Sequence, residues 1–97
     1  MTDRVKLVSQ GGATSIFIDA GFEANGDLQI SGQDLGEAPS EIHGDMDYEY
    51  WLTVPAAEKD KLLLALLVKH YSDNAMVVSN LRELLQSKQI DFQFFSS

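Results

Sequence analysis

Residues 26–54, GDLQISGQDLGEAPSEIHGDMDYEYWLTV, predict two strands joined by a loop, and the rest of the predicted fold is built around them. In residues 27–32 and 47–54 apolar and polar side chains alternate, which is the pattern of a strand with one face toward a core. Residues 33–46 break that alternation with Gly, Pro and several carboxylates, so we expect an irregular acidic loop there. A loop of this length inside a small domain is often functional.

The turn that leads into this stretch and the aromatic residues within it set the predicted geometry. Asn25-Gly26 lies between two alternating segments and predicts a two-residue hairpin turn in which both residues take positive φ. Strand alternation places Tyr48 and Tyr50 on one face and Trp51 on the other. We expect the two tyrosines to face the core and Trp51 to lie on an outer, acidic face.

The flanking sequence supplies the remaining elements. Alternation predicts three further strands, over residues 4–9, 14–23 and 90–94. Helical spacing of apolar residues predicts two helices, the first over about 55–70 and the second over about 77–88. The intervening Ser-Asp-Asn at 72–74 is expected to end the first helix and to cap the second.

The predicted order of elements, β-β-β-loop-β-α-α-β, indicates one α+β domain over residues 1–97. We expect a mostly antiparallel sheet of four or five strands, with the two helices packed on one face. The core is expected to contain the inward positions of these elements, namely Ile16, Ile18, Leu28, Ile30, Tyr48, Tyr50, Leu52, Leu63, Leu66, Leu67, Leu81, Leu84, Leu85, Phe92 and Phe94.

Composition narrows the class of protein. Fifteen acidic residues against seven basic ones give a net charge of −8, which argues against nucleic acid and anionic membranes as partners. Cysteine is absent, so disulfides and thiolate chemistry are excluded. The longest apolar run, residues 62–68, is far shorter than the roughly 20 residues that cross a bilayer. With no signal-like segment at the N-terminus, we expect a cytoplasmic protein.

The charges are also unevenly distributed along the chain. Residues 7–58 contain no Lys or Arg, whereas they contain ten acids, Asp19, Glu23, Asp27, Asp34, Glu37, Glu41, Asp45, Asp47, Glu49 and Glu58. We expect this span to form one negative surface of sheet and loop that docks a basic protein, although an acidic surface can also serve solubility alone. The predicted partner-binding residues are Asp34, Glu37, Glu41, Asp45, Asp47, Glu49 and Trp51.

Catalytic and metal-binding patterns are weak. The sequence has no nucleophile motif of the G-x-S-x-G type and no phosphate loop, so we expect no enzyme activity, no catalytic residues and no cofactor. The segment starting at Asp45 begins like a calcium loop, but Tyr50 and Ala56 stand where that loop needs Gly and Glu. A looser site built from Asp34, Asp45 and Asp47 is less favoured than carboxylates that bond turn amides.

Several segments carry a resemblance to a known family. GDLQISGQDLG, GDMDYEYWLTV and QIDFQFFSS resemble a family of small bacterial proteins of uncharacterised activity with the motifs GDL-x3-GQDLG, GD-x-DYEY and GI-x-F-x-F. The resemblance covers most of the chain from Gly26 onward, and Gln89 stands where the family has Gly. It implies no particular activity, although the size and acidity are similar to those of toxin immunity proteins.

Two functions remain open from the sequence. The first is an immunity or inhibitor module that neutralises a basic protein partner, such as a nuclease toxin, by occluding its cationic site with the acidic residues, with Trp51 as an apolar anchor. The second is a small-molecule or metal-ion binding domain that uses the acidic segment 33–49. A homodimer is compatible with either function.

Overall fold

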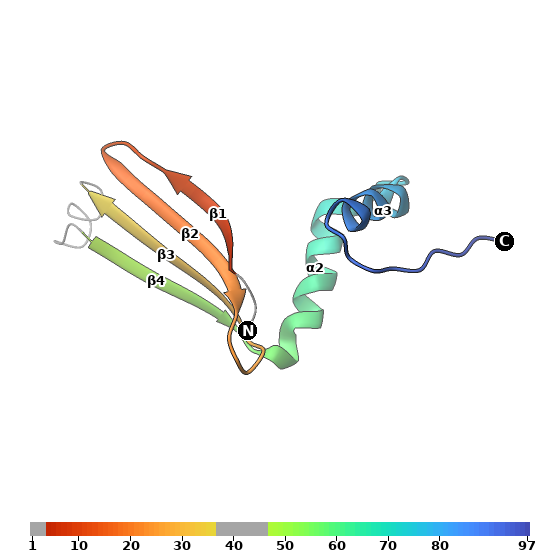
Figure 1. Cartoon of the computed structure of the whole chain (residues 1–97), viewed down its shortest axis with the longest axis horizontal. Coiled ribbons are helices and arrows are strands. Elements are labelled where there is room, and N and C mark those ends of the chain that lie inside the picture. The colour runs from red at the N-terminus through yellow and green to blue at the C-terminus, as the bar shows by residue number, and fades with distance from the viewer. Residues whose placement is uncertain (1–3, 37–46) are drawn as a thin grey trace. The chain divides into compact units, whose positions relative to one another are not determined.

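The computed structural model describes residues 4–36 and 47–97, and the chain divides into two compact units, Met1–Leu62 and Leu63–Ser97. The first unit contains a four-stranded antiparallel sheet, and the second contains most of the helical residues (Figure 1). The predicted α+β class and the antiparallel sheet are therefore confirmed. The single domain and the packing of the helices on one face of the sheet stay predictions.

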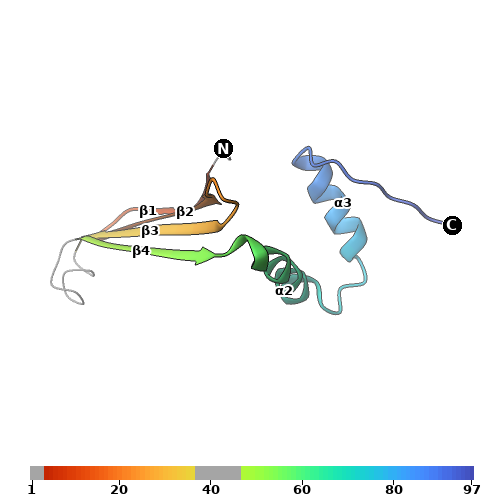
Figure 2. The ribbon, with the colours of Figure 1, turned by 90° about the horizontal axis from the view of Figure 1, so that it is seen from below.

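The sheet is a meander in which each strand pairs with the next one along the chain. Its strands are β1 (Val5–Gln10), β2 (Thr14–Phe22), β3 (Leu28–Gly36) and β4 (Asp47–Val54), in the order β1-β2-β3-β4. All three pairings are antiparallel, and Figure 2 shows the strands nearly edge-on as one layer. β1 and β4 are consequently the two edges of the sheet.

The hairpin between β2 and β3 forms where it was predicted, but the predicted turn type is wrong. Only Gly26 takes a positive φ, of 92°, and Asn25 does not. The Glu23 amide donates to the Asp27 carbonyl at 2.8 Å, and the Gly26 amide donates to the Glu23 carbonyl at 2.9 Å. The Asn25 side chain accepts from the Asp27 amide at 3.0 Å. This bond gives Asn25 a local partner without the left-handed conformation.

β3 is longer than predicted. It continues through Gly36 and pairs residue by residue with β2 as far as Thr14 and with β4 as far as Asp47. The first four residues of the predicted acidic loop, 33–36, are therefore strand. The alternation was hidden because Gly32 and Asp34 occupy positions on the apolar face of the sheet, where the pattern calls for large apolar residues.

The two faces of the sheet differ in chemistry. The face that we call the tyrosine face carries Ile16, Ile18, Ala20, Ile30, Asp34, Tyr48, Tyr50 and Leu52. The face that we call the pocket face carries Phe17, Asp19, Ser31, Gln33, Glu49 and Trp51. The predicted separation of Tyr48 and Tyr50 from Trp51 is thus confirmed, since strand neighbours point to opposite faces.

Most of the side chains predicted as core are exposed or half-buried within their own units. Among the described residues, Ala20 is the only apolar side chain that counts as buried, while Leu52, Leu63 and Leu84 are 59%, 57% and 45% exposed. A core closed between the sheet and the helices stays a prediction. Within its own unit the sheet is a single layer, so its apolar side chains have neighbours beside them but no second layer above them.

The chain passes from β4 into the helices through a short 3-10 helix, η1 (Ala56–Glu58), which follows Pro55. The Asp27 Oδ1 accepts from the Ala56 amide at 2.8 Å, so the hairpin end anchors the first helical turn. The Lys59 ammonium lies 4.7 Å from the centre of the Phe22 ring, a cation–π distance. These two contacts fix η1 against the β2–β3 end of the sheet.

Two helices follow, α2 (Lys59–Tyr71) and α3 (Val77–Ser87). The turn between them is made by Ser72, whose hydroxyl donates to the Val68 carbonyl at 2.6 Å, and by Asp73 at a φ of 62°. The cap of α3 is Met76, whose amide donates to the Asn74 side chain at 2.9 Å. In the described residues no helix is long and apolar enough to cross a membrane.

The predicted closing strand over residues 90–94 does not form. After α3, Gln89 takes a φ of 58° and the Ile90 amide donates to the Leu85 carbonyl, which is a helix C-cap of the left-handed type. Residues 90–97 then have no regular secondary structure, and Phe94 lies under the Arg82 guanidinium at 4.0 Å. Alternation alone could not produce a strand, because a strand also needs a neighbour with which to pair.

Candidate functional site

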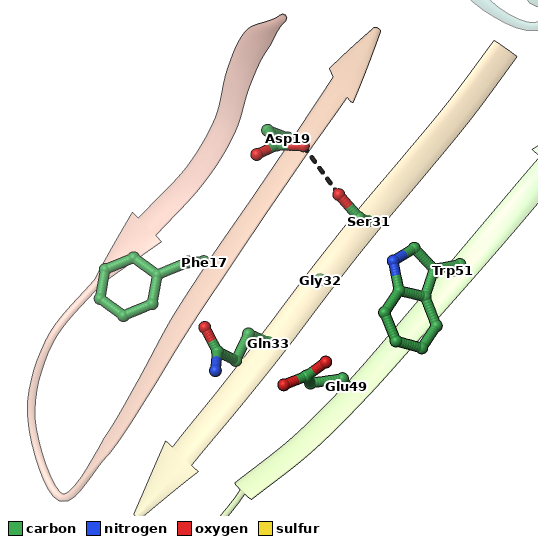
Figure 3. Close-up of a pocket in the computed structure, with 7 residues that line it drawn as sticks. All are labelled: Phe17, Asp19, Ser31, Gly32, Gln33, Glu49 and Trp51. Atoms are coloured by element: carbon green, nitrogen blue, oxygen red, sulfur yellow. Dashed lines mark hydrogen bonds between the residues drawn. The ribbon is translucent and has the colours of Figure 1, made fainter. Parts of the chain in front are cut away.

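An open pocket of about 240 Å³ lies on the pocket face of the sheet. Six side chains from three neighbouring strands and the backbone of Gly32 line it, and the side chains form two rows across the sheet. The rows are Phe17–Gln33–Glu49 and Asp19–Ser31–Trp51. Figure 3 shows the Gln33 amide and the Glu49 carboxylate between the Phe17 ring and the Trp51 indole.

The strand register places these residues together. β2 contributes Phe17 and Asp19, which pair with Gln33 and Ser31 of β3. Residues two apart on a strand point to the same face, and directly paired residues on neighbouring strands lie side by side. Each strand therefore contributes two side chains to one surface.

Asp19 is already paired within the chain. The Arg4 Nε donates to the Asp19 Oδ1 at 2.8 Å, and the Ser31 hydroxyl donates to the same oxygen at 2.9 Å. The Arg4 Nη2 also donates to the Ser31 Oγ at 3.1 Å and to the Gln29 carbonyl at 3.2 Å. The hydrogen bonds from Arg4 and then Ser31 lower the pKa of the Asp19 carboxyl from its ordinary value. Asp19 is thus a neutralised carboxylate at one end of the pocket.

Glu49 differs from Asp19 in this respect. Across residues 4–36 and 47–97, no Lys or Arg lies within ion-pair distance of its carboxylate. The two aromatic side chains at opposite ends of the pocket are exposed, Phe17 at 43% and Trp51 at 61%. A carboxylate between two exposed aromatic rings can pair with a cation while the rings provide cation–π contact.

The tyrosine face has a polar contact of its own. The Tyr50 hydroxyl donates to the Asp34 Oδ1 at 2.9 Å, and the Tyr50 ring lies over Gly32. Burial of the phenol raises the pKa of Tyr50 above its ordinary value, and the Asp34 carboxylate raises it further. Asp34 therefore holds the Tyr50 ring in place rather than facing solvent beside Glu49.

The structure separates the residues predicted to bind a partner. Glu49 and Trp51 both line the pocket, whereas Asp34 lies on the tyrosine face. Asp47 is the first residue of β4 and pairs with Leu35. The remaining predicted residues, Glu37, Glu41 and Asp45, lie outside the described residues. The acidic span is therefore divided between both faces of the sheet and does not form one continuous negative surface over the described strands.

The pocket also contains residues that sequence reasoning missed. Phe17, Gln33, Asp19 and Ser31 were not predicted as part of a site, although residues two apart on a strand, such as Phe17 and Asp19, share a face. The missing information was the pairing of β2 with β3 and of β3 with β4. Given that register, strand parity alone would have placed Phe17 and Asp19 on the same face as Trp51.

The described residues give no support to the metal alternative. Within residues 4–36 and 47–97, no group of three His, Asp or Glu side chains could hold a metal ion. Of the three carboxylates of that alternative, Asp45 lies outside this part of the chain, and Asp34 accepts a hydrogen bond from the Tyr50 hydroxyl.

Comparison with known proteins does not assign a family or a function to this chain. No family model matches the chain, and neither a curated protein nor a solved structure matches it. The resemblance to the GDL-x3-GQDLG family stays a prediction, and the function has to be argued from the site.

Proposed function

We infer that this chain is a small acidic protein-binding module of the immunity or inhibitor type, which neutralises a basic protein by covering its cationic site. The pocket between Phe17 and Trp51, with Glu49 between them, is the observation that carries the proposal. In this role the protein performs no chemistry of its own. Its partner would be a protein with a cluster of Lys or Arg, as nucleic-acid-cleaving toxins have.

The charges support this partner class. Between residues 7 and 58 the chain has ten acids and no base, so a basic protein is attracted from a distance and an acidic one is repelled. Of the two carboxylates in the pocket, Asp19 is paired with Arg4 while Glu49 has no cationic partner among the described residues. Glu49 is therefore the carboxylate that receives a Lys or Arg of the partner.

The aromatic side chains supply the short-range part of binding. Trp51 is 61% exposed, and buried tryptophans are among the side chains that contribute most to protein interfaces. A partner cation paired with Glu49 would lie in the pocket that the Phe17 and Trp51 rings also line. Steering by charge and anchoring by an aromatic residue are separate effects, and they can be measured separately.

The test uses the full chain as bait in an extract of the source organism, followed by titration of the purified partner in a calorimeter. The baits are the wild type, Glu49→Lys, Trp51→Ala and the control Glu83→Lys, which makes the same charge change on exposed α3. We expect one basic protein to bind the wild type and the control stoichiometrically. It should bind Glu49→Lys at least tenfold more weakly.

Salt and folding complete the test. Binding should weaken as salt rises to about 1 M, where the screening length falls to about 3 Å. Circular dichroism melts of all four proteins check that the variants fold. Equal binding by Glu49→Lys and Glu83→Lys would rule out the pocket as the docking site. A copurifying small molecule or metal ion in native mass spectra, with no basic protein bound, would favour the alternative of a ligand-binding domain.

A further inference from the structure

The two edges of the sheet are built differently. β1 has six residues, carries Lys6, and has a register irregularity against β2 between Lys6 and Val8. A bulge and a Lys on an edge strand are both features that prevent another strand from pairing there. β1 is therefore a protected edge.

β4 has none of these features. Its eight residues pair with β3 in one unbroken register, from Leu28↔Val54 to Leu35↔Asp47. Residues 47–54 contain no Lys, Arg or Pro, and Pro55 comes only after the strand ends. Within the described residues β4 pairs with β3 alone, so one row of its backbone amides and carbonyls has no strand partner (Figure 1). An edge of this length and regularity is a template for an added strand.

We propose that the β4 edge receives an extended segment of the basic partner as a fifth strand of the sheet. This inference rests on the proposed function and specifies how the partner binds. Backbone hydrogen bonds along β4 would supply affinity that does not depend on side chains, and the side chains next to the edge would select the sequence of the segment.

Charge and alternation define that sequence. On the pocket face β4 presents Glu49 and Trp51 to a neighbouring strand, and on the tyrosine face it presents Tyr48, Tyr50 and Leu52. Side chains directly opposite on paired strands contact each other, and opposite charges there are stabilising. The segment that fits has Lys or Arg at every second residue, facing Glu49 and Trp51, with Val, Ile or Thr between them. A second copy of this chain fits less well, because its β4 has carboxylates at the positions where bases are needed.

The probe is a terminally blocked octapeptide in which Lys alternates with Val or Thr, added to the full-length protein. A peptide of the same composition with all its lysines at one end is the control for charge. We expect the alternating peptide to bind at least tenfold more tightly than the control. In hydrogen exchange followed by NMR, every second amide of β4 should become slower on binding, while the amides already bonded to β3 should not change.

Two N-methylated versions of the peptide test backbone pairing directly. One carries methyl groups on the amides of its odd residues and the other on those of its even residues. In a strand added to an edge, only every second amide points toward that edge and bonds to it. One version should therefore bind like the parent, and the other should lose at least tenfold in affinity. Equal affinities of the two versions, or slower exchange along β1 in place of β4, would overturn the proposal.

The remaining outcomes separate this proposal from the proposed function. If the protein alone sediments as a dimer with its β4 amides already protected, a second copy occupies the edge and the proposal is wrong. If no peptide binds at millimolar concentration, the edge proposal is also wrong. The proposed function is then judged on its own by the titration of the purified partner with the Glu49→Lys and Glu83→Lys variants.

Discussion

The ring of Tyr50 occupies the space that a side chain at Gly32 would need. The two residues are paired across β3 and β4, and a Cβ built on Gly32 would overlap the Tyr50 ring and hydroxyl. The same hydroxyl donates to Asp34 at 2.9 Å, so the missing side chain at position 32 lets the ring lie flat across β3. This contact joins the two strands that form most of the pocket.

We therefore expect Gly32→Ala to destabilise the protein. The added methyl group must displace the Tyr50 ring, and overpacking of this kind typically costs about 1–3 kcal/mol. Chemical denaturation measures the loss. Gly11→Ala is the matched control, since a Cβ at Gly11 meets nothing within 4 Å and should change stability by less than about 0.5 kcal/mol. Equal effects of the two substitutions would contradict the contact.

Removing the charge of Asp34 should change the titration of Tyr50. Burial and then the Asp34 carboxylate raise the pKa of the Tyr50 phenol, so Asp34→Asn should move that pKa back toward 10.0. Because the folded pKa is raised, this group stabilises the fold below its unfolded pKa, and the contribution is lost as the pH rises through the folded value. NMR titration of the Tyr50 ring carbon measures the shift. Glu49→Gln, on the other face, should leave it unchanged.

The ion pair between Arg4 and Asp19 leads to a prediction about stability at acidic pH. Hydrogen bonds from Arg4 and Ser31 lower the pKa of Asp19 below 3.8, so its contribution to stability is present above that pH and lost as the pH falls through the folded value. Arg4→Gln should raise the Asp19 pKa, as followed by NMR of its carboxyl carbon. Lys69→Gln removes the same charge at an exposed residue of the second unit and serves as the control. If both substitutions shift Asp19 equally, the cause is net charge and not the hydrogen bond.

Asp27 should matter for the start of the helical segment. Its carboxylate accepts from the Ala56 amide at 2.8 Å, which otherwise has no partner in the first turn. Asp27→Ala should cost about 0.5–2 kcal/mol, as the loss of a capping side chain does. Asp27→Asn keeps an acceptor oxygen and should cost much less. Thermal or denaturant unfolding compares the two variants, and an Asp27→Asn loss as large as that of Asp27→Ala would show that charge, not the hydrogen bond, is what matters.

Two neighbouring phenylalanines in the C-terminal segment allow the contact with Arg82 to be tested. Phe94 lies under the Arg82 guanidinium at 4.0 Å, whereas Phe95 is 89% exposed. Phe94→Leu should lose about 0.5–1 kcal/mol of cation–π interaction, and Phe95→Leu should lose almost nothing. Equal melting temperatures for the two variants would argue against the Arg82 contact.

Local periodicity was enough to predict most of the elements. Residues 47–54 form a strand with the predicted bounds, and Tyr48 and Trp51 lie on the predicted opposite faces. Both helices also begin and end near their predicted residues. These features depend on side-chain spacing within one segment, which can be read directly from the sequence.

Periodicity failed where pairing between distant segments decides the structure. β3 continues through Gly36 because β2 and β4 pair with it on both sides, whereas residues 90–94 alternate in the same way and remain without a strand partner. The turn at Asn25 likewise follows its own side-chain hydrogen bond to Asp27 rather than the dipeptide rule.

For the site, the sequence by itself determined that Glu49 and Trp51 share a face, and that residues 7–58 have no positive charge to oppose an acidic surface. Only the tertiary structure decided that Phe17 and Asp19 join them, that Arg4 neutralises Asp19, and that Asp34 belongs to the opposite face. The register of a sheet depends on contacts between residues far apart in the chain, and a shift of one residue reverses every face. The charge inventory is therefore a property of the sequence, whereas the grouping of those charges into a pocket is a property of the strand pairing.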